Sequence, residues 1–355
     1  MNGAAQQSIE RWLKHHPSYY LYKKNIKPGL TPENRQKQVD FSKHVHNRWG
    51  LPPGKKVLWI MSDEKWFHSL VPRSNAKTCK ELRIPVQSYS AHHKKNIKKV
   101  MVHCTVGYCF DGDPENGGEG FLIGCHRCAA FKVPQRDVRY SSKDPNTGRT
   151  IFRGNPIKHR RGVPYLVDCN VTGSDPGTPT DPKFPLQKLW EHTLIPSIEA
   201  LVSPGGPCSG AQVVFQEDNA GPHQEGTYRE WMLAEFEQRN WMVELQAPQG
   251  PYTNVLDLYL FPGMSHRHSE IIQLYNSTEA NMERTWNTVL GVWGSTSSAE
   301  VARAFVLAYR IMRLIIEENG NNSWLSEGTP HCNVRHDYID TNTGIRPRII
   351  INIDD

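Results

Sequence analysis

The sequence predicts an α/β fold, in which a buried sheet is covered by helices, and three observations support this prediction. Residues 57–61 (VLWIM) form a continuous apolar run, which is typical of a strand that is covered on both faces. Residues 186–201 and residues 297–316 carry apolar side chains at helical spacing. Strand and helix signals alternate along the chain, which is the pattern of an α/β architecture.

Size and composition indicate a globular protein. The chain has 355 residues, of which 37% are hydrophobic and 22% charged, so it is long enough for one large core or two domains. Its net charge of +6 gives a weak preference for polyanionic partners. No apolar run approaches the roughly 20 residues of a membrane span, so we expect no membrane partner. Because no secretory signal is visible, the eight cysteines are expected to be thiols or metal ligands rather than disulfides.

The N-terminal part of the chain contains two predicted helices. Residues 8–15 form a short helix that ends before Pro17, and a linker rich in tyrosine and lysine follows. Thr31 and Pro32 have the pattern of an N-cap followed by proline at the first helical position. This pattern predicts a polar helix that continues to about residue 46.

The predicted strand at 57–61 ends in Ser62, Asp63 and Glu64, so a buried strand delivers carboxylates at its end. Residues 99–131 alternate in polarity around the turn sequence GDPENGGEG, which predicts two strands of a meander. The following segment, 132–182, is rich in proline, glycine, arginine and lysine, and we expect it to be mostly loop.

The second half of the chain repeats the pattern of a buried strand that ends in acid. The sequence AQVVFQEDNAGPH (211–223) predicts a strand that leads to Asp218. A helix over about 225–239 and a short strand over 241–248 are expected next, and Asn254 is the predicted cap of a further helix. The helix over 297–316 begins with a serine and a glutamate at capping-box spacing.

Three aspartates occupy related places in these elements. Asp63 and Asp218 follow predicted buried strands, and Asp257 lies in the first turn of a predicted helix. Strands that run in parallel end at the same edge of a sheet, so the three carboxylates can meet there. A divalent cation such as Mg²⁺ or Mn²⁺ would relieve their mutual repulsion. The alternative interpretation is that each aspartate is a turn or helix-cap residue.

The sequences around these aspartates resemble a known family. SDEKWF (62–67), QEDNAGPH (216–223) and APQGPYTNVLDLYLF (247–261) are similar to the three signature blocks of mariner-like transposases, especially the plant- and protist-type branch. The resemblance implies an RNase H-like mixed sheet flanked by helices. It also implies an insertion between the first two catalytic acids and a helical extension at the C-terminus.

The resemblance assigns chemistry to the three aspartates. Asp63, Asp218 and Asp257 would be both the catalytic residues and the ligands of two Mg²⁺ or Mn²⁺ ions. The implied reaction is hydrolysis of a phosphodiester at the ends of a transposable element, followed by transfer of the 3′-hydroxyl into target DNA. The implied partners are double-stranded DNA, as terminal inverted repeats and target, and a second copy of the chain in a homodimer. The implied location is the nucleus.

The resemblance also divides the chain. It predicts a remnant of a helix-turn-helix unit at 1–16, a linker and helix at 17–50, the catalytic domain at 51–290 and a C-terminal helical extension at 291–355. Members of the family carry two helix-turn-helix units before the catalytic domain, so the chain is expected to be truncated at its N-terminus. The family motif Ser-Pro-Asp-Leu-Asn is replaced here by Gly-Pro-Tyr-Thr-Asn at 250–254.

Two alternative functions follow from other features. The chain could be a catalytically inactive or domesticated DNA-binding scaffold derived from such an element. It could also be a nucleic-acid-binding module with a structural Zn²⁺ site, because four cysteines have paired spacing. The other interpretation of these four is that they are ordinary strand residues: Cys104, Cys109, Cys125 and Cys128.

Several side chains near the aspartates have less certain roles in the pattern. Neighbouring residues of a strand point to opposite faces, so Glu64 and Glu217 are expected to be outer-shell or solvent-facing residues rather than ligands. His223 is expected either to orient a water or phosphate or to be structural. The basic runs 92–99 and 158–161 are solvated faces or contacts to DNA phosphates.

Overall fold

The computed structural model describes residues 30–49, 55–69 and 98–320, apart from residues 141, 145, 146, 148, 219, 225, 249 and 275–280. The predictions for the helix at 8–15, for the linker before residue 30 and for residues 321–355 lie outside the described residues. So does most of the basic run 92–99. None of the helices in these ranges is both long and apolar enough to cross a membrane.

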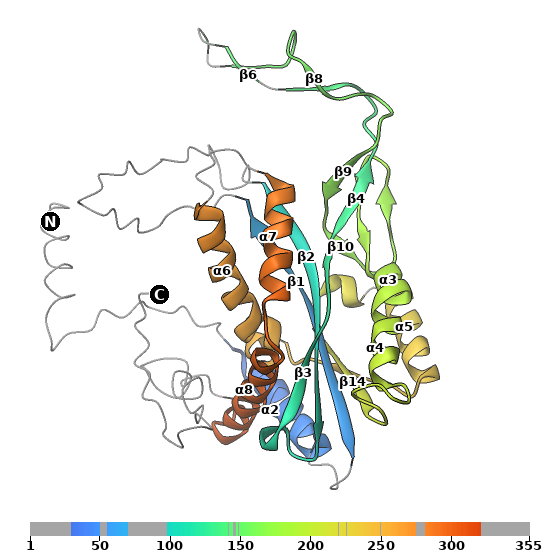
Figure 1. Ribbon diagram of the computed structural model, residues 1–355, viewed down its shortest axis with the longest axis vertical. Helices are drawn as coiled ribbons and strands as arrows, with labels where there is room; N and C mark the ends of the chain where they lie inside the picture. The colour runs from blue at the N-terminus through green and yellow to red at the C-terminus, as the bar shows by residue number, and fades with distance from the viewer. Residues whose placement is uncertain are drawn as a thin grey trace, which may run out of the picture.

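The centre of the molecule is a five-stranded mixed sheet with the strand order β15–β14–β1–β2–β3. β1, β2 and β3 form an antiparallel meander, whereas β14 and β15 run parallel to β1. This arrangement confirms the predicted mixed sheet and the predicted meander (Figure 1). The bounds of the strands are Lys56–His68 (β1), Lys99–Asp111 (β2), Gly118–Arg127 (β3), Gln212–Glu217 (β14) and Met242–Leu245 (β15).

β1 is longer than the sequence predicts, and Asp63 does not end it. The parallel partner β14 pairs with β1 only as far as Met61, opposite Gln216. β2 stays paired on the other side of β1 as far as His68, and Asp63 lies opposite Cys104 in that ladder. Asp63 is therefore in the middle of a strand, just beyond the point where its parallel neighbour ends.

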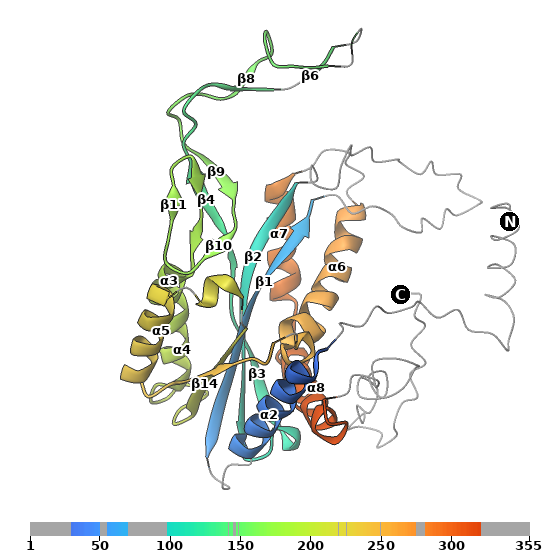
Figure 2. The ribbon, with the colours of Figure 1, turned by 180° about the vertical axis from the view of Figure 1, so that it is seen from behind.

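Four helices cover one face of the sheet (Figures 1 and 2). They are α2 (Pro32–Trp49), α6 (Phe261–Leu274), α7 (Met282–Gly294) and α8 (Ser298–Glu317). Phe305 of α8 packs on Trp59 and Tyr108 of the sheet, with ring centroids 5.0 and 5.5 Å apart respectively. A Cβ atom at Gly120 of β3 would lie 2.4 Å from the backbone oxygen of Ser298, so this glycine permits the close contact with α8.

Two predicted helix starts on this face are confirmed. The hydroxyl oxygen of Thr31 accepts a hydrogen bond from the backbone N–H of Asn34 at 3.2 Å, so Thr31 caps α2. Ser297 and Glu300 form the capping box of α8. α8 shares its core with the central sheet, although it lies outside the range predicted for the catalytic domain.

The opposite face is covered by the helical segment of residues 186–202 and by α5 (Gly226–Gln238). Both helical segments were predicted, the first from its apolar spacing. Trp190 packs edge-on against Phe215 of β14 and Phe236 of α5, with ring centroids 4.7 and 5.5 Å apart. The segment at 186–202 consists of α3 (Leu186–Leu189), a π-helical turn (Trp190–Leu194) and α4 (Ile195–Val202). Pro196, which has no N–H to donate, follows the π turn.

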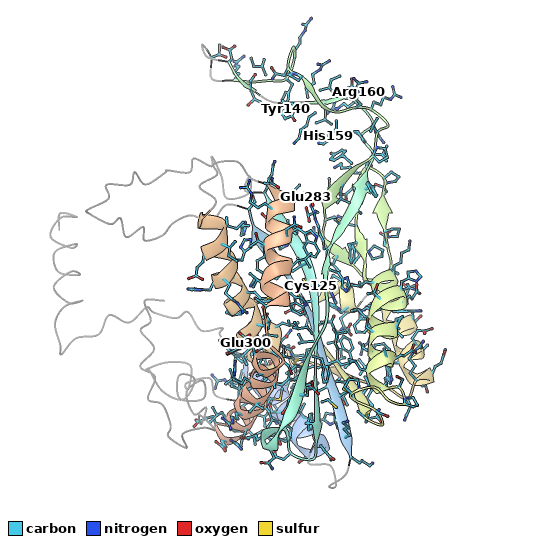
Figure 3. All side chains as sticks on the ribbon, viewed as in Figure 1. Cys125, Tyr140, His159, Arg160, Glu283 and Glu300 are labelled. Carbon is cyan, nitrogen blue, oxygen red and sulfur yellow. The ribbon has the colours of Figure 1, made fainter. Side chains whose placement is uncertain are left out.

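Residues 129–168 form an arm that projects from the body of the molecule (Figures 1 and 3). The prediction of mostly loop was wrong in part, because this segment contains short antiparallel strand pairs. Each pair has only two to four residues, which is too short for a recognisable alternation. The pairs are β4 (Ala129–Lys132) with β9 (Tyr165–Asp168), β5 (Val138–Arg139) with β8 (Ile157–His159), and β6 (Ser142–Lys143) with β7 (Thr150–Ile151).

Short strands also connect the arm to α3. β10 pairs with β13 in parallel, and β11 pairs with β12 in an antiparallel ladder. Their bounds are Val171–Thr172 (β10), Gly177–Thr178 (β11), Asp181–Pro182 (β12) and Phe184–Pro185 (β13).

Candidate active site

The three predicted aspartates come from three elements that meet at one edge of the sheet. Asp63 lies in β1, Asp218 follows β14 directly, and Asp257 lies in a π-helical turn, Leu256–Leu260, that leads into α6. Asp63 and Asp257 share a side-chain hydrogen bond, and the charge of Asp218 acts on both. The structure therefore makes neighbours of three residues that are up to 194 positions apart in the sequence.

Asp63 is almost buried, with 9% of its surface exposed. Its Oδ1 accepts a hydrogen bond from the backbone N–H of Glu64 at 2.7 Å, and its Oδ2 accepts one from Nδ2 of Asn254 at 3.0 Å. Oδ1 of Asn254 accepts a third bond, from the N–H of Leu256 at 3.0 Å. The sequence predicted Asn254 only as a helix cap; in the structure it caps the turn and also fixes Asp63.

The carboxylates disturb one another electrostatically. Burial raises the pKa of Asp63 from 3.8 to about 8, and the negative charges of Asp257, Glu64 and Asp218 contribute to this rise. Asp257 is more exposed, but partial burial raises its pKa as well. The charge of Lys65 opposes that rise, the charge of Asp218 adds to it, and the hydrogen bond from Asp63 opposes it. At neutral pH the edge therefore retains a proton on Asp63, next to the carboxylate of Asp257.

The donor set suits a hard divalent cation, because carboxylate oxygens are the ligands that Mg²⁺ and Mn²⁺ prefer and a cation would relieve the repulsion described above. In this structure the three carboxylates are not arranged as a complete set of metal ligands. Across the described ranges, no group of three or more His, Cys, Asp or Glu residues is arranged to hold a metal ion. Oδ1 of Asp218 instead lies 3.4 Å from His223 and accepts the N–H of Ala220 at 3.1 Å.

In β1, the strand alternation places Asp63 and Glu64 on opposite faces of the sheet, as predicted. Asp63 has the parity of Trp59 and Met61, which face α8, whereas Glu64 has the parity of Leu58 and Ile60, which face α5. Glu64 and its neighbours are nevertheless not solvent-facing. Only 11% of the side-chain surface of Glu64 is exposed, and the side chain of Glu217 is 1% exposed.

A buried network of opposite charges stabilises these two glutamates. Nδ1 of His223 lies 3.0 Å from Glu217, and its Nε2 lies 3.5 Å from Glu64. Arg229 of α5 pairs with the second oxygen of Glu217. His103 of β2 lies 3.7 Å from Glu64, but burial lowers its pKa to about 4, so it is a neutral neighbour at neutral pH. A buried carboxylate requires such partners because burying it alone is costly.

The network shifts the pKa values of its members. Burial lowers the pKa of His223, but its hydrogen bond to Glu217 and its interaction with Glu64 outweigh burial and raise the pKa well above its usual value. Burial raises the pKa of Glu64, but His223 and His103 outweigh that effect and lower it. Burial raises the pKa of Glu217 in spite of His223 and Arg229. The imidazole of His223 is therefore protonated at neutral pH and is a second cation of this network beside Arg229.

Several polar residues behind the site were not predicted. Gln216 donates to the carbonyl oxygen of Thr253 at 2.8 Å, and Gln246 donates to that of Gly250 at 2.5 Å. These bonds hold the loop before Asp257 against β14 and the end of β15. The only sequence signal for Gln216 was its place inside a signature block, and Gln246 lies directly before another. No sequence pattern pointed to Arg229. The only indication was that a buried carboxylate such as Glu217 requires a cationic partner.

The structure contradicts the zinc site at Cys104, Cys109, Cys125 and Cys128. Sγ of Cys104 lies 3.6 Å from Sγ of Cys125, but Cys109 and Cys128 belong to the core on the other face of the sheet. Cys109 hydrogen-bonds to Cys208 instead. Cysteines on opposite faces of a sheet cannot converge on one ion, and this geometry overturns the zinc prediction.

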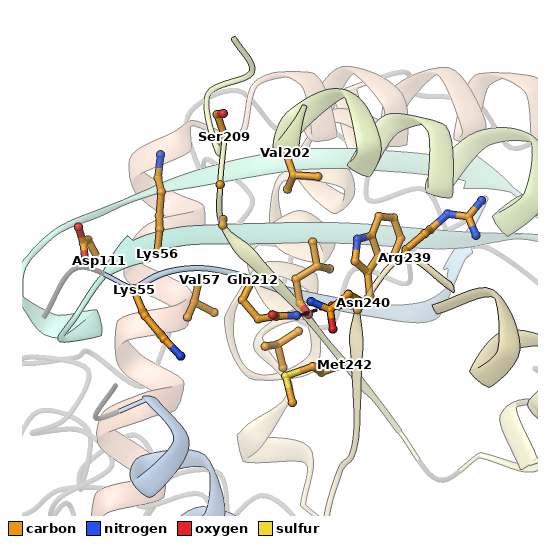
Figure 4. A pocket seen from close by; sticks show the side chains of 15 residues that line it. Lys55, Lys56, Val57, Asp111, Val202, Ser209, Gln212, Arg239, Asn240 and Met242 are labelled. Carbon is orange, nitrogen blue, oxygen red and sulfur yellow. Dashed lines mark hydrogen bonds between the residues drawn. The ribbon is translucent and has the colours of Figure 1, made fainter. Parts of the chain in front are cut away.

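The basic run 158–161 lies on the arm, where Lys158, Arg160 and Arg161 are exposed (Figure 3). A separate cavity of about 850 Å³ lies at the starts of β1 and β14, away from the aspartates (Figure 4). Two of its lining cations are engaged, since Lys56 donates to the carbonyl oxygen of Pro207 and Arg239 contacts two glutamates.

Comparison with known proteins gives similarity at the level of structure. No protein-family model and no curated protein matches the chain. The crystal structure of the Mos1 mariner paired end complex with Mn is similar with a TM-score of 0.50 and 15% identity, over 89% of this chain and 71% of that chain. A pre-cleavage Mos1 transpososome has a TM-score of 0.49 at 15% identity, over 89% and 71% of the two chains. The catalytic domain of Mos1 mariner transposase has a TM-score of 0.43 at 13% identity, over 84% and 98%.

The similarity to the paired end complex concerns the fold. Together with the order and directions of the five strands, it confirms the predicted RNase H-like sheet flanked by helices. At 15% identity it does not assign a role to any residue of this chain.

Proposed function

We propose that this chain is a mariner-like DNA transposase, of the plant- and protist-type branch, that cleaves phosphodiesters at element ends and transfers the 3′-hydroxyl into target DNA. The observation that carries the proposal is that Asp63 in β1, Asp218 directly after β14 and Asp257 in the turn before α6 meet at one edge of an RNase H-like sheet. The 38 residues that lie between Asp218 and Asp257 are close to the spacing of that branch, which supports it.

Asp63, Asp218 and Asp257 are proposed to hold two Mg²⁺ or Mn²⁺ ions. When bound, the ions would supply an activated water or hydroxyl and stabilise the leaving oxygen of the scissile phosphate. Asp63 must lose its proton to become a ligand. Asn254 keeps the Asp63 carboxylate oriented toward the helix that carries Asp257. Glu64 and Glu217 would remain paired behind the site and take no part as ligands.

The proposed substrate is double-stranded DNA, as terminal repeats and as target, and the proposed location is the nucleus. The crystal structures of Mos1 include a paired end complex and a strand transfer complex. In this chain, the exposed cations Lys158, Arg160 and Arg161 are suited to contact DNA phosphates. Such contacts add affinity but do not read the base sequence.

The proposed assembly is a homodimer that uses the arm. Exposed apolar side chains concentrate on the arm, which is typical of an interaction surface rather than of a free hairpin. Most of the exposed large apolar residues in the described ranges lie there: Phe131, Val138, Tyr140, Ile151, Phe152, Ile157, Val163 and Leu166.

A nicking assay tests the proposed function. Purified protein is incubated with Mn²⁺ and supercoiled plasmid, and conversion to open-circular DNA is measured for the wild type and for Asp218→Ala. We expect nicking by the wild type. In Asp218→Ala the rate of nicking should fall at least about a hundredfold, because the substitution removes a charge that the transition state requires. Absence of nicking, or nicking that Asp218→Ala leaves unchanged, would favour the inactive DNA-binding scaffold instead.

A further inference from the structure

We infer that His223 is a positioning residue that holds Asp218 at the edge of the sheet through one oxygen and leaves the other oxygen for a cation. The relevance of this role to catalysis rests on the proposed function. The geometry of the imidazole, its anchoring and its contact with Asp218 each support a step of the inference.

The imidazole lies between three acids from two strands. His223 follows β14 in a short 3₁₀ turn, Gly221–Gln224, and only 2% of its surface is exposed. Its Nδ1 lies 3.0 Å from Glu217, whereas its Nε2 lies 3.4 Å from Asp218 and 3.5 Å from Glu64. The two ring nitrogens therefore have different surroundings, one with a short contact and one shared between two carboxylates.

The Nδ1 side anchors the ring. Glu217 is buried and bonded on its other oxygen to Arg229 of α5, so it cannot turn to follow the imidazole. Movement of His223 would leave this carboxylate with a missing partner in the protein interior, which is strongly unfavourable. The position of Nε2 is thus fixed from behind the site.

Nε2 of His223 contacts Asp218 at only one of its two carboxylate oxygens. A distance of 3.4 Å is longer than a normal hydrogen bond, so the contact is a weak electrostatic one. The other contact of Asp218, from the N–H of Ala220 at 3.1 Å, uses the same Oδ1 atom. Within the described residues, Oδ2 makes no hydrogen bond of its own. One oxygen is therefore held by the protein and the second remains for a ligand.

Glu64 gives Nε2 a second partner when Asp218 shifts. Its Oε2 is only 0.1 Å farther from Nε2 than Oδ1 of Asp218 is. After a small movement of Asp218 toward a cation, Nε2 would therefore still have Glu64 as an electrostatic contact at 3.5 Å. Residues behind metal-binding carboxylates commonly act in this way, and their loss typically costs 10- to 100-fold in metal affinity.

Two substitutions distinguish the roles of the two ring nitrogens of His223. The amide of His223→Asn can replace Nδ1 and bond Glu217, but it does not reach the place of Nε2. The amide of His223→Gln is one methylene longer and can replace Nε2. The affinity for Mn²⁺, followed by the electron paramagnetic resonance signal of free Mn²⁺, is expected to fall about 10- to 100-fold in His223→Asn. It should fall by less than about threefold in His223→Gln, within the variation expected for a conservative change.

The control variant is His268→Asn, which removes another buried imidazole, on α6. It should leave the Mn²⁺ affinity unchanged, and unfolding in EDTA reports the structural cost of all three variants. Equal affinities, or equal losses, in the two His223 variants would overturn the positioning role. If the wild type binds no Mn²⁺, the proposed function and this inference both fail; if only the His223 variants behave alike, this inference alone fails.

A second measurement uses the wild-type protein and therefore does not require that any variant folds. In a crystal structure of the wild-type protein with Mn²⁺, Nε2 of His223 is expected to contact Oδ1 of Asp218 or Oε2 of Glu64, while the other oxygen of Asp218 faces the ion. An imidazole that has turned away from both acids would contradict the inference.

Discussion

The side chain of Asn254 donates a hydrogen bond to Asp63 at 3.0 Å, across 191 residues of sequence. Its amide oxygen accepts a hydrogen bond from the backbone N–H of Leu256 and so caps the turn that contains Asp257. One amide thus connects the strand that carries the first aspartate to the helix that carries the third. Asn254 is 4% exposed, so water cannot easily replace either bond.

Asn254→Ala should weaken both stability and activity. It leaves Oδ2 of Asp63 without its donor, and an unsatisfied buried acceptor costs about 1–3 kcal/mol. The free energy of unfolding, measured with urea, should fall by that amount, and Mn²⁺-dependent nicking should fall at least about tenfold because Asp63 loses its orientation.

The matched control for this substitution is Asn281→Ala. Asn281 caps α7 by accepting the N–H of Arg284 at 2.9 Å, away from the aspartates. It should lose about 1 kcal/mol of stability, as other caps do, with nicking unchanged. Equal nicking by Asn254→Ala and the wild type would show that Asn254 is only a helix cap.

The raised pKa of Asp63 predicts how stability depends on pH in the absence of metal. The folded state holds this proton up to about pH 8, whereas the unfolded chain releases it near 3.8. The stabilising contribution is therefore fully present below about pH 4 and is lost as the pH rises through 8. Asp63→Asn should remove this loss and be more stable than the wild type at pH 8.5 in EDTA, by about 2 kcal/mol.

Urea denaturation at pH 4.5, 6.5 and 8.5 measures this effect. Addition of Mn²⁺ should reverse the ranking, because the ion stabilises the wild type and not the variant. If both proteins lose stability in parallel over this range, the proton is not held by Asp63.

Removing only one member of the buried pair of Glu217 and Arg229 should strongly destabilise the protein. Arg229→Met should lower the free energy of unfolding by about 3–5 kcal/mol, because it removes a cationic partner of a buried carboxylate. The double variant Glu217→Gln with Arg229→Met should recover most of this loss. Arg239→Met is the control: Arg239 pairs with Glu199 and Glu235 at the surface, and its loss should cost under about 1 kcal/mol.

If the arm forms the dimer contact, its removal should abolish dimerisation without unfolding the protein. The N–H of Gly162 donates to the carbonyl oxygen of Pro134 at 2.9 Å, so a short Gly-Ser linker can replace residues 135–161. This deletion should convert a dimer to a monomer in light scattering. It should shift the midpoint of thermal unfolding little, because none of the removed residues that the structure describes belongs to either core cluster. A deletion variant that remains dimeric would place the dimer contact elsewhere.

Much of the fold could be predicted because its signals are local. The apolar runs at 57–61 and 211–215 and the helical periods at 186–201 and 297–316 correspond to elements of the structure. The length of β1 could not be predicted, since it depends on pairing with β2 as far as His68. The short strands of the arm could not be predicted either, because two-residue pairings leave no periodic pattern.

The site was predictable to a smaller extent. The signature blocks contain all three aspartates and also Asn254, Gln216 and His223. Their contacts depend on which side chains are buried together, and sequence spacing does not contain this information. Arg229 illustrates the limit, because a buried Glu217 requires a cation but the sequence offers many.

The central claim is that Asp63, Asp218 and Asp257 together bind divalent ions, and a Mn²⁺ titration of the protein tests it most directly. The account predicts saturable binding by the wild type and at least a tenfold weaker affinity in each of Asp63→Asn, Asp218→Asn and Asp257→Asn, since each removes a charged ligand. The exposed Asp175→Asn should bind as the wild type does. Binding that is unaffected by all three substitutions would contradict the account.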